Sequence, residues 1–250
     1  GWSTPILVAE LEESLRGVAH SGAIDRGVES YLQWWNQQDH RAAEAVWHSE
    51  FDSPMPTMVG EGPVTGERAI ATASPDPAAL ERIAAHGTTL AAAAQAAWAR
   101  VLARLTGRTD VSYLLASAGR PEECPGLTDA VGMFVTTRPM RVDARRRADD
   151  LAHDVVAMAE RTETAAHLGL GRIVRIVGEV ADTLVVVENY PKPQAVPMAS
   201  GPRVEPLSGE DATTYPLVAT VLLGDTVELE VEAAVGASTV DADRVAETWA

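Results

Sequence analysis

The six histidines come first, because histidine is the side chain most often used as a general base near neutral pH and as a metal ligand. They are His20, His40, His48, His86, His153 and His167. No two of them follow a metal-binding spacing such as His-x-x-x-His, so we expect no metal site. His153 and His167 fall on or at the end of a predicted helix, where a surface or core role is commoner than that of a base.

The other reactive residue types do not form a recognisable site either. Cys124 is the single cysteine, and its acidic neighbours Glu122 and Glu123 disfavour a thiolate. The sequence has no Gly-x-Ser-x-Gly element of the kind that presents a nucleophilic serine. The glycine pairs in 60–62 and 169–171 lack the full phosphate-loop spacing and are better explained as turns. We therefore assign no catalytic residue from these patterns.

Composition narrows the class of protein. The chain has 250 residues with 46% hydrophobic content and a net charge of -16, which fits one large or two small globular domains and argues against nucleic-acid binding. The arginines at 145–147 precede Asp149 and Asp150, which favours a solvated turn over a phosphate patch. No apolar run is long enough for a membrane span, and no signal peptide is evident. A lone cysteine suits a reducing compartment, so we expect a cytoplasmic protein without a membrane or nucleic-acid partner.

Hydrophobic periodicity predicts alternating helices and strands. We expect helices over 3–16, 28–50, a short one from Asp76-Pro77 to Gly87, one from Thr88 or Thr89 to Gly107, 148–166, and a last helix from Thr239 or Asp241. We expect strands over 111–115, 132–142 and 183–187, and a hairpin of 215–223 with 226–233. Residues 52–77 and 191–212 are rich in proline and are read as irregular, the former as the boundary between two units. The pattern predicts an α/β fold with a layered mixed β-sheet and flanking helices.

Several stretches, in this order, resemble one protein family. Gly1-Trp2-Ser3 leads into an apolar helix at 5–11, as in the segment that follows the His-His-x-x-x-Asp-Gly motif of nonribosomal peptide synthetase condensation domains. The segments LTGRTDV at 105–111, AGRP at 118–121, VGMFVTTRPMR at 131–141 and DTLVVVENYP at 182–191 resemble further motifs of that family. The chain is thus similar to the C-terminal part of a condensation domain, and the resemblance spans nearly all of it.

The resemblance implies a fold, a domain division and a reaction. The family has two lobes related to chloramphenicol acetyltransferase, and this chain would supply a helical tail of the first lobe at 1–60, a linker at 61–75 and the second lobe at 76–250. Family members form an amide between two acyl or aminoacyl thioesters that carrier proteins hold on phosphopantetheine, with no other cofactor. Positioning carries most of such chemistry. The family's presumed base is the second histidine of the motif, which would lie before residue 1, so we expect no activity from this chain alone.

The resemblance also implies roles for particular residues. Gly1, Trp2 and Ser3 would be the remnant of the histidine motif, and Arg120 would bind the aspartate of that motif with a two-hydrogen-bond fork. Thr136 replaces a usual asparagine and Ala118 a usual serine, while the Glu-Asn-Tyr-Pro ending at 188–191 and His167 resemble the subtype that takes an L-configured donor. Candidates for the channel wall or the lobe interface are Gly119, Pro121, Phe134, Thr136, Arg138, Glu188, Asn189 and Tyr190.

Two other functions stay open at this point. The chain could belong to a non-catalytic condensation-like module that recruits partners, or to a free-standing acyltransferase of the same superfamily. The partners expected from the resemblance are peptidyl carrier proteins, the missing first lobe and adjacent synthetase domains. We also expect self-association, because Trp2, Trp34, Trp35 and Trp47 would be uncovered without that lobe.

Overall fold

The computed structural model describes residues 2–18, 26–64, 66–188, 213–224, 226–238 and 240–250. The chain divides into two compact units. The smaller unit comprises Gly1–Gln38, Ala118–Val135 and Asn189–Ala212, and the larger unit comprises Asp39–Ser117, Thr136–Glu188 and Thr213–Ala250. The predicted division at 1–60, 61–75 and 76–250 follows the family's lobes and stays a prediction.

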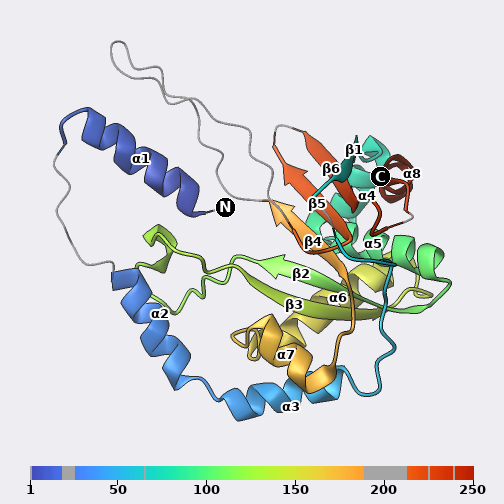
Figure 1. Cartoon of the computed structure of the whole chain (residues 1–250), viewed down its shortest axis with the longest axis horizontal. Coiled ribbons are helices and arrows are strands. Elements are labelled where there is room, and N and C mark those ends of the chain that lie inside the picture. The colour runs from blue at the N-terminus through green and yellow to red at the C-terminus, as the bar shows by residue number, and fades with distance from the viewer. Residues whose placement is uncertain (1, 19–25, 65, 189–212, 225, 239) are drawn as a thin grey trace. The chain divides into compact units, whose positions relative to one another are not determined.

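Helices and strands alternate along most of the chain (Figure 1). The helices are α1 (Ser3–Leu15), α2 (Arg26–Gln37), α3 (His40–Glu50), α4 (Pro77–Ala85), α5 (Leu90–Thr106), α6 (Ala148–Glu163), α7 (Leu170–Val177) and α8 (Ala242–Trp249), with a 3-10 turn η1 (Leu127–Asp129). The strands are β1 (Arg68–Ala73), β2 (Asp110–Ser117), β3 (Thr136–Asp143), β4 (Thr183–Glu188), β5 (Leu217–Leu223) and β6 (Val227–Ala234).

The strands form one mixed sheet in the order β1-β6-β5-β4-β2-β3. Strand β4 lies at the centre and pairs in parallel with both β2 and β5, as its continuous apolar run predicts. The predicted hairpin is present as the antiparallel pair β5–β6, and β2–β3 is also antiparallel. The predicted mixed α/β fold is therefore confirmed.

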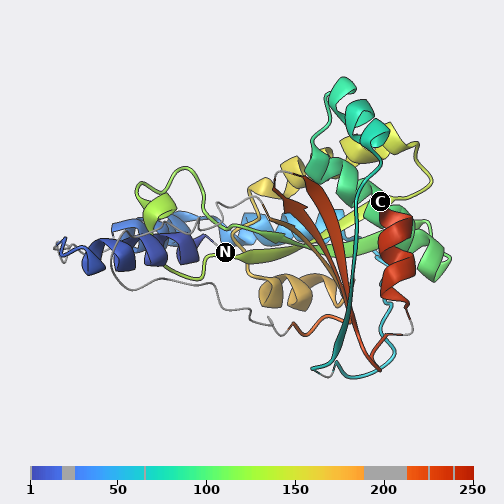
Figure 2. The same ribbon diagram turned by 90° about the horizontal axis from the view of Figure 1, so that it is seen from above.

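The two faces of this sheet are covered differently. One face, which we call the core face, carries Val111, Tyr113, Val185 and Val231 and packs under α5, α6 and α8. Figure 2 shows α7 on the other side of the strands. This other face carries Leu114 and Leu184 near α7 and a row of glutamates, Glu228, Glu230 and Glu232, along β6. The larger unit thus contains a continuous hydrophobic core on one face of its sheet.

The helix predicted over 28–50 is two helices in the structure. The break falls at Asp39, whose carboxylate accepts hydrogen bonds from the backbone N–H groups of Arg41 and Ala42 at 3.0 and 2.9 Å. An aspartate at such a position caps the start of a new helix and competes with continuation of the old one. The apolar period continues through the break, because α2 carries half-buried aromatic residues and α3 carries the buried Trp47, so the period alone did not reveal this cap.

Other sequence expectations also needed correction. The segment read as a linker contains β1, whose alanines face the core at the sheet edge. Helix α7 was missed because glycines at 169 and 171 suggested only a turn. Strand β3 starts at Thr136 and not at 132, since residues 132–135 belong to the smaller unit. The irregular segment predicted at 191–212 lies outside the described residues.

One prediction about exposure is wrong. Trp47 was expected to be uncovered, but it is fully buried in the larger unit, where its indole N–H donates to the carbonyl of Ala165 at 3.1 Å. Among the described residues, no helix combines the length and apolar character that a membrane span requires.

Candidate functional site

The start of α1 and the loop 118–135 meet in the smaller unit through the side chain of Ser3. Its hydroxyl donates to the carbonyl of Gly132 at 2.8 Å and accepts from the N–H of Gly132 at 3.0 Å. Ser3 was predicted to cap α1, but the hydroxyl makes no cap hydrogen bond and is used for this reciprocal contact instead. Ser3, the last residue of the predicted motif remnant, therefore fixes the loop to the helix, although Gly1 itself lies outside the described residues.

Arg120 is the centre of this contact. Its guanidinium donates to the carbonyl oxygens of Leu127 and Ala130, the latter at 2.9 Å, and to the Ser3 hydroxyl at 3.3 Å. Its Cζ also lies 4.7 Å from the centre of the Phe134 ring, within the range of a cation–π interaction. Arg120 thus holds both ends of the 127–134 segment and the first turn of α1. The predicted carboxylate partner stays a prediction, since in this structure Arg120 binds carbonyl and hydroxyl oxygens.

An aromatic cluster packs against the loop through Phe134. The Phe134 ring packs edge-on against Tyr31 of α2 at 5.3 Å, and Tyr31 contacts Trp34 at 5.8 Å. Gly132 leaves the space that the Phe134 ring occupies, because a Cβ on Gly132 would lie 2.7 Å from that ring. Small and large residues at 132 and 134 therefore fit each other, and this fit fixes the conformation of the loop.

The node of Ser3, Arg120, Gly132 and Phe134 borders a cavity of about 300 Å³. The guanidinium of Arg120 is the charged group in the cavity lining, whereas the neighbouring side chains of Met133 and Val135 are apolar and exposed, Met133 by 96%. A guanidinium beside an open, partly apolar cavity can bind a carboxylate or a carbonyl oxygen. It cannot accept a proton, so the described part of this site holds groups in position and supplies no general base.

The titratable groups close to this loop are held in their protonated forms. Burial raises the pKa of the Tyr31 hydroxyl, and the nearby Cys124 adds to that rise. Burial also raises the pKa of the Cys124 thiol, with a further contribution from the charge of Glu123. Both directions argue against proton abstraction by these residues at neutral pH. They agree with the sequence argument against Cys124 as a nucleophile.

The structure brings some of the predicted wall residues together and separates others. Gly119, with a left-handed φ of 61°, and Pro121 flank Arg120 in the loop, and Phe134 lies against it. Thr136 and Arg138 lie on the core face of β3, whereas Glu188 lies on the opposite face at the end of β4. Asn189 and Tyr190 lie outside the described residues.

Arg138 has a polar environment of its own on the core face. Its guanidinium donates to Glu163 at 3.1 Å, and its Nε is buried without a hydrogen-bond partner among the described residues. Gln95 accepts a hydrogen bond from the Tyr113 hydroxyl at 3.2 Å, and both residues are buried. Burial raises the pKa of Tyr113, so its hydroxyl remains a donor. Arg138 and Gln95 line the same cavity of about 510 Å³ between α5 and α6.

Sequence reasoning missed one paired site between α3 and the loop after α6. His167 donates from Nδ1 to the carbonyl of Thr164 and lies 3.1 Å from Nδ1 of His40 through its Nε2. Burial lowers the pKa of His167, and His40 and Arg172 lower it further. His167 is therefore a neutral core histidine, as the commoner role for an isolated histidine suggested, but its partner is 127 residues away and no spacing revealed it.

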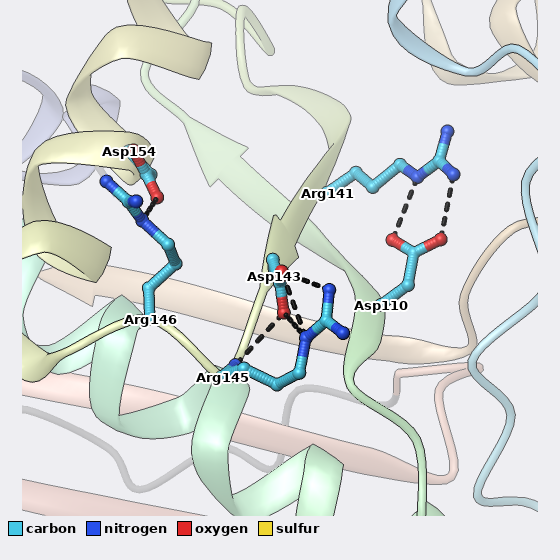
Figure 3. Close-up of polar contacts among 6 residues, drawn as sticks. All are labelled: Asp110, Arg141, Asp143, Arg145, Arg146 and Asp154. Carbon is cyan, nitrogen blue, oxygen red and sulfur yellow. Dashed lines mark hydrogen bonds and ion pairs between the residues drawn. The ribbon is translucent and has the colours of Figure 1, made fainter.

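The arginines at 145–147 are exposed, as the predicted solvated turn requires, but the described ion pairs of this segment are made with carboxylates other than Asp149 and Asp150. Figure 3 shows Arg141 bound by two hydrogen bonds to Asp110 across the β2–β3 pair, at 2.9 and 2.7 Å. Arg145 pairs with Asp143, and Arg146 pairs with Asp154 of α6. Carboxylates thus neutralise two of the three arginines at 145–147, which are exposed as a solvated turn.

Comparison with known proteins shows which proteins this chain is similar to. The chain is 30% identical over 248 residues to chondramide synthase cmdD of Chondromyces crocatus, covering 91% of this chain and 6% of that protein. It is 28% identical over 241 residues to vanchrobactin synthetase VabF of Vibrio anguillarum, covering 92% of this chain and 8% of that protein. The chain therefore spans only a small part of these curated relatives.

Solved structures show the same fold. The starter condensation domain of rhizomide synthetase, in complex with C8-CoA and Leu-SNAC, superposes with a TM-score of 0.71 at 18% identity, covering 100% of this chain and 59% of that chain. The first condensation domain of the calcium-dependent antibiotic synthetase gives 0.71 at 20% identity, covering 93% and 56%. The family model described as "Condensation domain" matches residues 1–235. This chain belongs to the condensation domain family.

Proposed function

We propose that this chain is the C-terminal part of a condensation domain that forms an amide bond between two carrier-bound thioesters. In this reaction the amine of an acceptor aminoacyl thioester attacks the carbonyl of a donor thioester. The new carbon–nitrogen bond replaces the carbon–sulfur bond, the amine loses a proton, and the donor's carrier leaves as a thiol. Both substrates would arrive on phosphopantetheine arms, so no bound cofactor is required.

The observation that carries this proposal is the node at Arg120. It joins the first turn of α1, which begins with the serine of Gly-Trp-Ser, to the loop 118–135, which contains one of the segments that resemble family motifs and the start of another. A residue just before Gly1 would lie within a few residues of Ser3, whose position these hydrogen bonds fix. The node is thus suited to orient a catalytic motif at that place. Orientation of bound reactants supplies a large share of the rate in reactions of this type.

The proposal that this chain is only part of a domain is supported by the lack of a candidate general base among the described residues at the cavity. The sequence contains no adjacent pair of histidines. The charged residue among the lining residues of the cavity is Arg120, and burial raises the pKa of both the Tyr31 hydroxyl and the Cys124 thiol close to the loop. This chain also covers only 59% of a solved condensation domain. We infer that the histidine motif and the first lobe belong to polypeptide that precedes Gly1 in the working domain.

A direct test compares this chain with a version extended by its natural upstream residues. Each protein is incubated with two aminoacyl-loaded carrier proteins, and dipeptidyl thioester is measured by mass spectrometry. We expect product from the extended protein and none above the uncatalysed control from residues 1–250 alone. Product from both at similar rates would show that the described residues contain a base that this account overlooks.

A second candidate is a recruitment module without catalysis. The absence of a base near the described cavity favours it, and an X-domain from teicoplanin biosynthesis, also solved in complex with OxyB, shares the fold with a TM-score of 0.65. An extended protein that contains the double histidine and still makes no amide with any loaded carrier would favour this candidate. Specific carrier proteins, an L-configured donor and a cytoplasmic location remain part of our proposal.

A further inference from the structure

A second groove, in the larger unit, shares no lining residue with the cavity at the Arg120 node. It runs between the C-terminal end of α5, the first half of α8 and the crossing segment 56–61, and has a volume of about 770 Å³. Helices α5 and α8 lie next to each other in Figure 2. The floor of the groove is apolar, with Val101 and Val245 buried beneath it and Met58 and Leu105 about 40% exposed.

Three arginines line this groove, and none has a side-chain partner among the described residues. Arg104 and Arg244 are exposed and Arg108 is half-buried. Within the described part of the chain, none of these three side chains makes a hydrogen bond or an ion pair. Other described arginines, such as Arg141 and Arg145, pair with a carboxylate, and some, such as Arg41 and Arg82, do not. Arg104, Arg108 and Arg244 differ in that all three line one groove. The groove therefore brings three arginines together with two acidic residues, Glu61 and Asp241, on a protein of net charge -16.

A purely structural role explains only part of this arrangement. Arg104 lies in the last turn of α5, where a cation interacts favourably with the helix dipole. Arg244 lies in the first turn of α8, where the dipole is positive and a cation is disfavoured. Arg108 lies beyond the end of α5, after Gly107. The dipole thus accounts for one of the three, and a negatively charged ligand would be attracted to all of them.

The acidic groups of the groove leave the arginines available. Asp241 caps α8 by accepting from the N–H of Arg244 at 3.2 Å, and Glu61 forms no ion pair with an arginine in the described structure. The apolar floor then selects among anionic ligands. A small anion such as phosphate would leave Met58 and Leu105 in contact with water, whereas a peptide with alternating carboxylate and apolar side chains would cover them.

We infer that this groove docks an acidic, amphipathic peptide segment of a partner protein or neighbouring domain. Its carboxylates would pair with Arg104, Arg108 and Arg244, and its apolar side chains would rest on Leu105 and Met58. The inference is independent of the amide-forming reaction proposed above, because the groove contains none of the residues of the Arg120 node.

The test measures binding of a fluorescein-labelled peptide made of repeated Glu-Leu-Glu units by fluorescence anisotropy. The matched probe replaces every glutamate with glutamine. The groove variant R104S/R108S/R244S is compared with the control R41S/R82S/R147S, which removes the same charge from three other exposed arginines of the larger unit that have no described side-chain partner. Circular dichroism and a melting curve establish that each variant is folded.

We expect the wild-type chain to bind the glutamate peptide and not the glutamine peptide. The groove variant should bind it about tenfold more weakly, as three exposed ion pairs would together provide, and the control should stay within about twofold of wild type. Absence of binding to the wild type, equal weakening by both triple variants, or equal binding of the glutamine peptide would overturn the inference. Displacement of the peptide by millimolar inorganic phosphate would show a small-anion site and would also overturn it.

Discussion

The two units of this chain are stabilised in different ways. The larger unit buries continuous apolar surface between one face of its sheet and α5, α6 and α8. In the smaller unit, α1 buries none of its described residues, and its contacts with loop 118–135 include the hydrogen bonds of one serine and one arginine. The larger unit is therefore stabilised by an extensive buried apolar core, whereas α1 of the smaller unit is held to loop 118–135 by contacts that include these polar ones and leaves Leu7, Leu11 and Leu15 exposed.

The largest expected effect is the difference in stability loss when one large side chain is removed from each unit. Trp47→Ala in the larger unit should lower the free energy of unfolding by about 3–5 kcal/mol, because Trp47 is fully buried. Leu11→Ala on α1 should cost less than about 0.5 kcal/mol, because Leu11 is 49% exposed. Chemical denaturation of both variants measures the difference. Similar losses would mean that α1 is as firmly packed as the core.

The next effect concerns the loop at the Arg120 node. Gly132→Ala should destabilise the loop by about 1–3 kcal/mol, because the new Cβ would overlap the buried Phe134 ring. Gly66→Ala is the control, since no atom of the described residues lies within 4 Å of the place that its new Cβ would take. Hydrogen exchange should rise in peptides from 118–135 in the first variant alone. Unchanged protection there would contradict the described packing of Gly132 on Phe134.

A smaller effect should appear in the pH dependence of the larger unit. The pKa of folded His167 lies below its unfolded value of about 6.5, so the unfolded chain binds more protons as the pH falls. The stabilising contribution of neutral His167 is therefore complete above about pH 6.5 and is lost as the pH falls through the lower folded pKa. Melting temperatures from about pH 7.5 to about pH 5 should fall less steeply for His167→Gln than for wild type. The exposed control His153→Gln should keep the wild-type slope, and a wild-type slope in both variants would refute the assignment.

The smallest effect on stability concerns association. Self-association was expected from four tryptophans, but Trp47 is buried, and the exposed apolar residues of the smaller unit include Leu7, Leu11 and Leu15 on α1. We predict that Leu11→Glu lowers the apparent mass in concentrated solution while the unfolding free energy changes by less than about 0.5 kcal/mol. Light scattering over a range of concentrations tests this. A strictly monomeric wild-type chain would contradict it.

Local sequence signals predicted much of the fold. Thr89 and Gly107 mark the ends of α5, and Asp76-Pro77 marks the start of α4. The signals failed where tertiary contacts decide the structure. Strand β1 has only alanines to face the core, so it shows little hydrophobic alternation, and it exists because β6 offers an unpaired edge.

The candidate site was also predictable only in part, because its contacts join residues that are distant in the sequence. The family motif singled out Arg120, but its partners are backbone carbonyls at Leu127 and Ala130, which have no sequence signature. The pairing of Ser3 with Gly132 spans 129 residues and replaces a local helix cap. The opposite placement of Arg138 and Glu188 depends on strand register, which the motifs alone do not specify.

The central claim is that Arg120 holds loop 118–135 and the start of α1 in the arrangement that amide formation requires. The most direct measurement is the rate of dipeptidyl thioester formation by the domain extended with its upstream residues, with Arg120→Ala compared with the exposed control Arg147→Ala. We predict at least a roughly tenfold lower rate for Arg120→Ala, equivalent to about 1.4 kcal/mol of lost transition-state stabilisation, and wild-type behaviour for Arg147→Ala. An Arg120→Ala domain that keeps both the wild-type rate and the wild-type melting temperature would contradict the account.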